Sequence, residues 1–422
     1  MSNRTGKNFT FIDLFAGCGG LSLGLEQAGF HPLLVSEVNK HAMETYMANR
    51  QGKGIKQEFD IHKLTNAKLG RYIDEWGNPD IDLVCGGPPC QGFSGIGHRR
   101  SFDIQKEDIP SNRLYLQMIR VIKKVKPKAF LFENVKGLMS GRWTKGGRKG
   151  EIWSDVSEAF KGIKGYVARH ALLQAKHYGV PQNRPRVMIV GIREDLAGYT
   201  KKNCVKDAVA ARFLPAGNGA VAPDLKDLLG DLVDPKYADK KATEKYLKDP
   251  SPGLAMDLRS MEDELTLKKG DLLTQQEYSN HKDEIREKFQ WMIDNKAGRM
   301  QDLPSKWRTK KFAQRVLPPK WSDGPNITAT SLPDDYVHYK QPRILTVREW
   351  ARLQTFPDWY DFRGPRTTGG RRRAGDPDAG IWDRDLPRYT QIGNAVPVLL
   401  AKKIGENMFN ILTGKIKLPV VL

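Results

Sequence analysis

The sequence has few cysteines, and none is arranged as a metal site or a disulfide framework requires. Its 422 residues include only Cys18, Cys85, Cys90 and Cys204, and no two of them form a C-x-x-C pair. Zinc knuckles and a disulfide-stapled scaffold are therefore not expected, and we predict no metal. Free thiols suit a reducing compartment, so we expect a cytoplasmic protein.

Long hydrophobic runs are also absent. No stretch approaches the roughly 20 apolar residues of a membrane span. The opening residues, MSNRTGKNFTF, lack the apolar segment of a signal peptide. We therefore expect a soluble chain with no membrane partner. Hydrophobic residues still make up 39% of the chain, which favours a folded protein with a sizeable core.

Acidic residues are outnumbered by basic ones. The chain has 49 Asp and Glu against 69 Lys and Arg, which gives a formal net charge of +20. Such an excess favours a polyanionic partner, and nucleic acid is the commonest one. A solvated basic surface would have the same composition, so charge alone leaves both interpretations open.

Short apolar runs alternate with helical patterns in the first half of the chain. The runs that read as buried strands are residues 9–15, 32–36, 81–85, 129–133 and 186–192. The segments with helical spacing between them are residues 21–29, 41–50 and 113–125. This alternation is typical of an α/β fold with a doubly wound, mostly parallel sheet, whose ligands bind beyond the carboxyl ends of the strands.

The pattern changes in the second half. Residues 196–342 are rich in Lys, Asp, Glu and Pro and show weak periodicity, so we expect a smaller, irregular domain there. Helical spacing returns at residues 346–356 and in a last helix at about residues 396–412, whose apolar face can pack on the first-half sheet. We predict one domain from residues 1–195 plus 390–422, and a second from residues 196–389.

A glycine-rich turn follows the first strand-like run. In DLFAGCGGLSLG, Gly17, Gly19 and Gly20 would let a ligand approach the backbone and the start of the next helix. Glu37 ends the second run, where a carboxylate can bind the hydroxyls of a ribose, and Asp60 ends a third. Together these positions indicate an adenosine cofactor. For the glycines alone, tight strand–helix packing remains the alternative.

A stiffened turn that ends in a cysteine follows residues 81–85. In GGPPCQGFSG, Pro88 and Pro89 fix the backbone directly before Cys90. A lone cysteine is commonly a small core residue, and Cys85, inside the run, fits that description. The position of Cys90 instead favours a nucleophile, whose pKa nearby positive charge or a helix end can lower.

Further polar groups are expected at the same edge of the sheet. FENV places Glu133 at the end of another run, although a single carboxylate there could also be a surface residue. QNRPRVMIVGI opens a later run with Gln182, Arg184 and Arg186, and strand alternation sends the two arginines to one side. Their guanidinium groups could hold a carboxylate, an anionic intermediate or a thiolate.

Six ordered blocks of the sequence resemble those of the bacterial DNA cytosine-5 methyltransferases. They are DLFAGCGGLSLG, GGPPCQGFS, FENVKGL, QNRPRVMIVGIR, RILTVREWARLQTFPD and QIGNAVP. The blocks span residues 9–195 and 343–412, and the combination of P-C-Q, E-N-V and Q-x-R-x-R is highly specific. Residues 196–342 fall where the family keeps its target-recognition domain.

The resemblance implies methyl transfer from S-adenosylmethionine to C5 of a cytosine flipped out of double-stranded DNA. Cys90 would attack C6 of the ring, and Glu133, Arg184 and Arg186 would support the reaction. The residues implied for the cofactor site are Phe15, Gly17, Gly19, Gly20, Glu37, Asp60 and Asn394. Those implied to meet the flipped base and the DNA are Gln91, Gly92, Phe93, Ser94 and Gln182.

The same resemblance implies the biological setting. We expect a monomeric, nucleoid-associated enzyme of a restriction-modification system, with a cognate restriction endonuclease that acts on the same site. The alternatives are a tRNA cytosine-5 methyltransferase of the same fold, a nicotinamide-dependent oxidoreductase and a catalytically silent DNA-binding protein. The G-x-G-G spacing disfavours the oxidoreductase. Arg371–Arg373 lie in an arginine-rich stretch that either contacts phosphates or is merely solvated.

Overall fold

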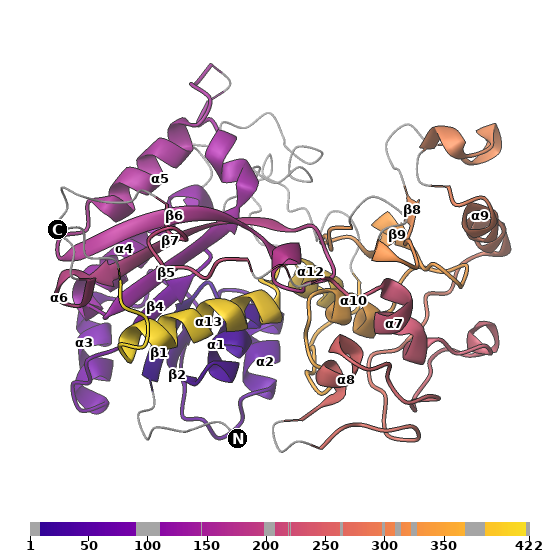
Figure 1. The fold of residues 1–422 in the computed structure, drawn as a ribbon, viewed down its shortest axis with the longest axis horizontal. Helices are drawn as coiled ribbons and strands as arrows, with labels where there is room; N and C mark the ends of the chain where they lie inside the picture. Colours follow the sequence, from indigo (N-terminus) through magenta and orange to yellow (C-terminus); the bar gives the residue numbers. More distant parts are fainter. Residues whose placement is uncertain are drawn as a thin grey trace.

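The chain forms a large sheet with helices on both faces, joined to a smaller region with little regular structure (Figure 1). The computed structural model describes residues 9–89, 110–144, 146–197, 207–217, 219, 221–261, 265–297, 300–308, 314–321, 327–367 and 385–418.

Seven strands build the sheet in the order β3-β2-β1-β4-β5-β7-β6. The strands are β1 (Phe9–Leu14), β2 (Phe30–Ser36), β3 (Lys56–Glu58), β4 (Leu83–Gly86), β5 (Ala129–Val135), β6 (Tyr166–Gln174) and β7 (Pro185–Arg193). Strands β1 to β5 run parallel, and β7 is antiparallel to both β5 and β6. The predicted α/β fold with a mostly parallel sheet is confirmed.

The helices are given in chain order; α13, although it comes last, packs on the sheet with α1. Those in the first part of the chain are α1 (Gly20–Gln27), α2 (Lys40–Ala48), α3 (Asn66–Glu75), α4 (Tyr115–Val125), α5 (Glu151–Lys161) and α6 (Glu194–Ala197). The later ones are α7 (Leu225–Leu229), α8 (Leu254–Arg259), α9 (Asp283–Asp294), α10 (Val347–Leu353), α12 (Arg388–Asn394) and α13 (Val398–Leu412). A short parallel pair, β8 (Arg315–Val316) and β9 (Tyr336–Val337), lies in the smaller region.

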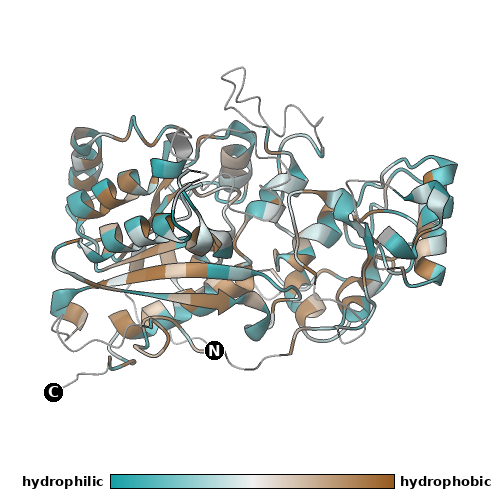
Figure 2. Cartoon of the chain, turned by 90° about the horizontal axis from the view of Figure 1, so that it is seen from above, coloured by the Kyte–Doolittle hydropathy of each residue, from teal (hydrophilic) through white to brown (hydrophobic). Residues whose placement is uncertain are grey.

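Alternating side chains of the strands supply a core on each face of the sheet. In β5, Ala129 and Leu131 join the core under α1 and α13, whereas Phe130 and Phe132 join the core under α3, α4 and α5. The apolar strands lie between helices with polar outer faces (Figure 2). Burial on both faces explains why these strands appear in the sequence as continuous apolar runs.

Helix α13 returns to the sheet by crossing α1 at very short range. A Cβ on Gly24 would lie 2.4 Å from the Ala401 Cβ and 2.5 Å from the Lys402 backbone nitrogen. Only glycine leaves room for this crossing. The expected packing of the last helix on the first-half sheet is therefore confirmed.

We expect Gly24→Ala to lower the free energy of unfolding by about 1–3 kcal/mol, because the new methyl group overpacks two helix backbones. This loss exceeds the roughly 1 kcal/mol that alanine gains over glycine in a helix. Gly70→Ala in α3 is the matched control, since the nearest atom to its Cβ would be 3.5 Å away. Urea unfolding measures both variants, and an unchanged Gly24→Ala would contradict the tight crossing.

The smaller region is held together by a buried network of charges. Arg352 in α10 binds Asp231 and Asp358, each at 2.6 Å, and Arg259 binds the same Asp231 at 2.5 Å. Removal of one member of such a network would leave another charge buried without a partner, and this would lower the stability of the fold. The network joins α10, which belongs to a family block, to the variable region before it.

The packing extends the sheet domain beyond the expected boundary at residue 195. Ala208, Ala211 and Phe213 are buried in the core shared by the sheet and α13. Leu23 of α1 also shares a core with Trp350 of α10, far along the chain. Buried side chains therefore connect the two predicted domains, and the division at residues 196–389 stays a prediction.

Candidate active site

The carboxyl ends of the parallel strands meet at one edge of the sheet and carry the expected site residues. Leu14 at the end of β1 pairs with Gly86 at the end of β4, and Gly86 pairs with Phe132 in β5. The glycine-rich turn, the proline turn and Glu133 therefore follow three neighbouring strands. The candidates that lie outside the described residues are Cys90, Gln91, Gly92, Phe93, Ser94 and Arg371–Arg373.

Glu133 lies against the turn that leads to Cys90. A Cβ on Gly87 would be only 2.8 Å from Glu133 Oε2, so the missing side chain of Gly87 makes room for the carboxyl group. Asn134 donates a hydrogen bond of 3.0 Å from Nδ2 to the Pro88 carbonyl. The end of β5 thus fixes the backbone two residues before Cys90 and places a carboxyl group beside it.

Arg186 binds Glu133 from the neighbouring strand β7, with Nε 2.7 Å from Oε1. In the antiparallel register Glu133 pairs with Met188, so Arg186 reaches it diagonally on the same face. Burial raises the pKa of Glu133, although Arg186 and then Arg184 act to lower it. A buried carboxyl with a raised pKa can keep its proton at higher pH and donate a hydrogen bond.

The hydrogen bonds of Arg184 go to backbone carbonyl groups, and the support of the reaction that the resemblance implies for this residue stays a prediction. It lies one residue before β7, so the alternation of a strand does not apply to it. Its guanidinium group is buried and donates to the Ala329 carbonyl at 2.8 Å and to the Gly393 carbonyl at 2.7 Å. Arg184 therefore ties the start of β7 to α12, and its charge acts to lower the pKa of Glu133.

Gln182 is also placed differently from the expectation of a DNA contact. It is fully buried, and its amide nitrogen Nε2 donates to the Leu353 carbonyl at 2.7 Å and to Gln354 Oε1 at 2.8 Å. Its Oε1 accepts from the Ala329 nitrogen at 3.0 Å. The side chain is committed to joining β7 to α10, so it does not offer its amide to DNA in this structure.

The glycine-rich turn has the conformation of a ligand cradle. Phe15, Gly17 and Gly19 have positive φ values of 60°, 56° and 84°. For Phe15 this is a strained conformation, of the kind that gathers at functional sites. A Cβ on Gly17 would meet no atom within 4 Å, so the space above it is open. Gly20 instead serves packing, because its Cβ would lie 2.5 Å from the Val396 carbonyl oxygen.

Three polar side chains belong to the elements around this turn. Glu37, after β2, accepts from the Gly17 nitrogen at 2.9 Å and from the Asn39 nitrogen at 2.8 Å, and burial raises its pKa. Asp60 is half-buried and follows β3, the neighbour of β2. Asn394 is exposed at the end of α12, just before the residues that touch Gly20. An open space at a glycine, with carboxyl groups at the adjacent strand ends, fits an adenosine cofactor.

Two buried side chains that sequence reasoning missed also contact the turn. Arg50 follows α2, and Tyr360 follows α10; both are among the largest fully buried residues. A buried arginine far from the glycine motif carries no local pattern that marks it. Tyr360 lies two residues after a family block, and this closeness to the block was the only sequence signal for it.

Within the described part of the chain, no three His, Cys, Asp or Glu side chains are grouped so as to hold a metal ion. No described helix is both long and apolar enough to cross a membrane.

We expect Gly87→Ala to lower the turnover number by about 10-fold or more, because the methyl group displaces the Glu133 carboxyl and a small misplacement is costly in catalysis. Gly146→Ala is the matched control, since a Cβ there meets no atom within 4 Å. Steady-state kinetics and circular dichroism of both variants test this. Full activity of Gly87→Ala would show that the carboxyl position is not critical.

Comparison with known proteins identifies the family. Residues 9–410 match the family described as C-5 cytosine-specific DNA methylase. The Type II methyltransferase M1.HphI of Haemophilus parahaemolyticus is 30% identical, over 97% of this chain and 88% of that protein. The Type II methyltransferase M.PspPI of Psychrobacter sp. is 32% identical, over 98% and 82%.

Solved structures show the same fold. A DNA modification methyltransferase encoded within a prophage of E. coli superposes with a TM-score of 0.66 at 24% identity, over 96% of this chain and 99% of that one. DNMT2 of Spodoptera frugiperda superposes with a TM-score of 0.51 at 15% identity, over 95% and 99%. From the sequence match, supported by the fold, the chain belongs to the C-5 cytosine-specific DNA methylase family.

Proposed function

We propose that this chain transfers a methyl group from S-adenosylmethionine to C5 of cytosine in double-stranded DNA. The observation that carries the proposal is the position of the Glu133 carboxyl against Gly87, three residues before Cys90 in the sequence. In this proposal Cys90 would be the nucleophile and Glu133 the acid that act on the same cytosine ring. Membership of the family and relatives that are Type II methyltransferases support the same reaction.

S-adenosylmethionine supplies the methyl group when it is bound. The open space at Gly17 and the carboxyl groups of Glu37 and Asp60 fit its adenosine half. Phe15 and Asn394 would line the same site, and Gly19 and Gly20 would let the turn pack closely against the residues around it. In this proposal Glu37 would bind the ribose hydroxyls, and Asp60 would bind the adenine amino group.

The chain's own residues would activate the cytosine. The ring must leave the base stack first, because C6 is not accessible inside the duplex. The Cys90 thiolate adds to C6, while Glu133 donates its proton toward N3, so that electron density moves to C5. Arg186 holds the Glu133 carboxyl in place. After methylation, N3 returns its proton to Glu133, and loss of the C5 proton to a base restores the C5–C6 double bond and expels the thiolate.

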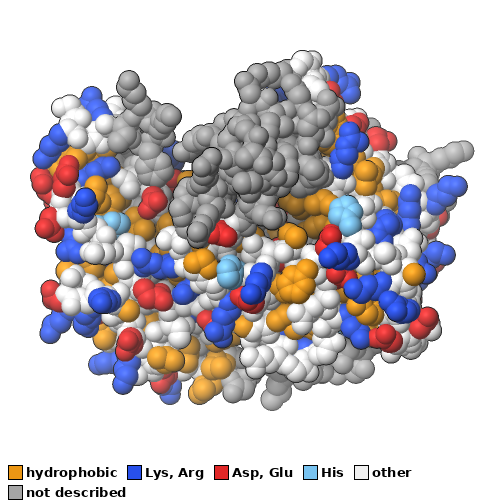
Figure 3. Space-filling model, turned by 180° about the vertical axis from the view of Figure 1, so that it is seen from behind, with side chains coloured by type: hydrophobic (Ala, Val, Ile, Leu, Met, Phe, Trp, Pro, Cys, Tyr) orange, Lys and Arg blue, Asp and Glu red, His pale blue; other side chains and the backbone are white. Residues whose placement is uncertain are grey.

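The partner would be double-stranded DNA. A net charge of +20 suits binding to phosphates, and Lys and Arg side chains are spread over both halves of the face in Figure 3. Sequence choice would come from the recognition region, residues 196–342. We further propose a monomer in the cytoplasm, associated with the nucleoid, and a cognate restriction endonuclease for the same site.

Tritiated methyl transfer tests this function. We expect label from S-adenosylmethionine to enter cytosine of duplex genomic DNA and not tRNA, with Cys90→Ala as the inactive control. Bisulfite sequencing of DNA from expressing cells then gives the sequence context. Label in tRNA alone would favour the tRNA enzyme of the same fold, and no label in either would favour a silent DNA-binding protein.

A further inference from the structure

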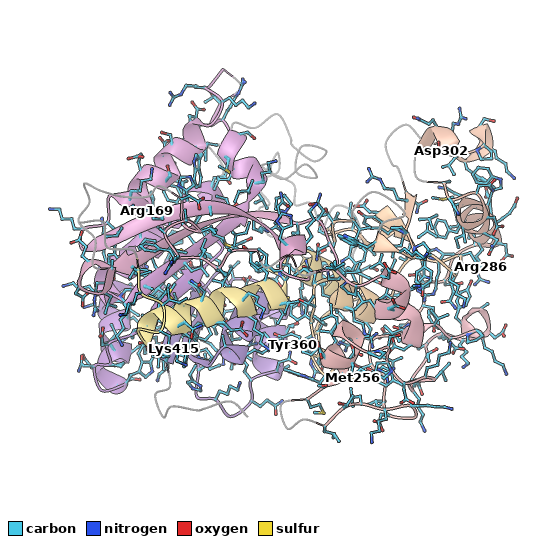
Figure 4. All side chains as sticks on the ribbon, viewed as in Figure 1. Arg169, Met256, Arg286, Asp302, Tyr360 and Lys415 are labelled. Carbon is cyan, nitrogen blue, oxygen red and sulfur yellow. The ribbon has the colours of Figure 1, made fainter. Side chains whose placement is uncertain are left out.

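The glycine turn of the proposed cofactor site is enclosed by three buried side chains from other parts of the chain. A Cβ on Gly19 would lie 2.8 Å from Tyr46, 2.9 Å from Arg50 and 2.9 Å from the Tyr360 hydroxyl. Tyr46 lies in α2, and Arg50 follows that helix. Tyr360 comes from the segment after α10, where the two halves of the molecule meet (Figure 4). These three side chains therefore pack against the turn at Gly19.

Tyr360 and Arg50 bind the carbonyl groups of the turn itself. The Tyr360 hydroxyl donates to the Cys18 carbonyl at 2.6 Å, and Arg50 Nη2 donates to the Gly19 carbonyl at 3.3 Å. Arg50 Nη1 also donates to the Tyr360 oxygen at 3.0 Å, which links the two supports. Hydrogen bonds to consecutive carbonyls restrict the peptides that carry the positive φ values of Gly17 and Gly19.

Arg50 is held rigidly in this position. Its Nη2 and Nε lie 2.6 Å and 2.8 Å from Glu26 Oε2, and its guanidinium group stacks over the Tyr46 ring at 3.9 Å. The side chain is only 1% exposed. A planar guanidinium can make these bonds and the stacking contact at once, which an ammonium group cannot.

Tyr360 is in turn fixed to the recognition region. Two residues earlier, Asp358 accepts from the Tyr246 hydroxyl at 2.7 Å and pairs with Arg352. The Asp358 nitrogen donates to the Leu258 carbonyl at 2.6 Å. Tyr246 and Leu258 belong to the variable region, so its packed core is linked through Tyr360 to the glycine turn.

We propose that Tyr360 and Arg50 are positioning residues that hold the glycine turn in its ligand-binding conformation. The affinity for the methyl donor then depends on two side chains that bind the turn but do not face the ligand. One of them, Tyr360, comes from the segment that is hydrogen-bonded to the recognition region. The proposal rests on the proposed function, which identifies the ligand as S-adenosylmethionine.

Tyr360→Phe removes the hydroxyl and keeps the ring. We expect the dissociation constant for S-adenosylmethionine, measured by isothermal titration calorimetry without DNA, to rise about tenfold, which corresponds to one hydrogen bond to a buried group. The KM for S-adenosylmethionine should rise in parallel. The turnover number at saturating donor and the KM for DNA should not change, because the reacting groups are untouched.

Tyr166→Phe is the matched control. Its hydroxyl is also buried and donates to a backbone carbonyl, that of Pro127, but at the opposite edge of the sheet. We expect a comparable loss of thermal stability and an unchanged dissociation constant. Arg50→Lys keeps the charge without the planar fork and should weaken donor binding as well, which gives a second test should Tyr360→Phe fold poorly.

Two results would overturn the proposal: wild-type donor affinity in both Tyr360→Phe and Arg50→Lys, or equally weakened binding in Tyr166→Phe. Failure of the proposed function would look different, because the wild-type protein itself would then bind no S-adenosylmethionine.

Discussion

Cys90→Ala is expected to lower methyl transfer to duplex DNA by about 10⁴-fold or more, because removal of a covalent nucleophile removes the reaction path that it opens. DNA binding should persist, since phosphate contacts do not involve the thiol. Cys90→Ser should behave in the same way, because a hydroxyl is far less ionised than a thiol at neutral pH. Tritiated methyl transfer and gel-shift titration of each variant measure the two effects.

Cys85→Ser is the control for a general effect of replacing a cysteine. Cys85 is fully buried inside β4, and burial raises the pKa of its thiol, so we do not expect it to act as the nucleophile. A duplex that carries 5-fluorocytosine in the methylated context should trap the wild-type protein covalently, because fluorine blocks the last elimination. Trapping that persists in Cys90→Ala would assign the nucleophile to another residue.

Glu133→Gln is expected to lower the turnover number by about 10²–10⁴-fold, the usual contribution of a positioned acid. The dissociation constant for S-adenosylmethionine should change little, because Glu133 follows β5 and not the glycine turn. Steady-state kinetics with calorimetry separates the two. A turnover number equal to that of the wild type would remove Glu133 from the mechanism.

The pH profile gives this second prediction an independent readout. Burial raises the pKa of Glu133 above 4.5, so the protonated acid is present below the raised value and is lost as pH rises through it. The wild-type kcat/KM should therefore fall on its alkaline side with the ionisation of Glu133. Glu133→Gln cannot ionise at that position, so its profile should lack this limb.

Glu349→Gln controls for the removal of a buried ion pair. Glu349 is fully buried and pairs with Arg343 at 2.6 Å in the smaller region, much as Glu133 pairs with Arg186. Both substitutions leave a buried arginine without its carboxylate and should lower stability by several kcal/mol. Only Glu133→Gln should remove the alkaline limb of the pH profile, because Glu349 is remote from the strand ends.

The local sequence predicted well those elements whose apolar patterns are continuous. Strands β1, β2, β4, β5 and β7 and helices α1, α2, α4, α10 and α13 all lie at or near the expected ranges. Strand β6 was missed, because this edge strand carries Arg169, His170 and other polar residues that break the apolar run. Helices α3, α5 and α9 were also missed, since polar residues outnumber apolar ones in each of them.

By itself the sequence determined which chemical groups stand at the carboxyl ends of the strands, because parallel strands bring the turns that follow them to one edge. Only the tertiary structure decided the roles of Arg184 and Tyr360. The carbonyl groups that Arg184 binds are 145 and 209 residues away in sequence, and the one that Tyr360 binds is 342 residues away. No local pattern encodes such a contact, because a buried polar side chain takes its partner from whatever backbone the completed fold places beside it.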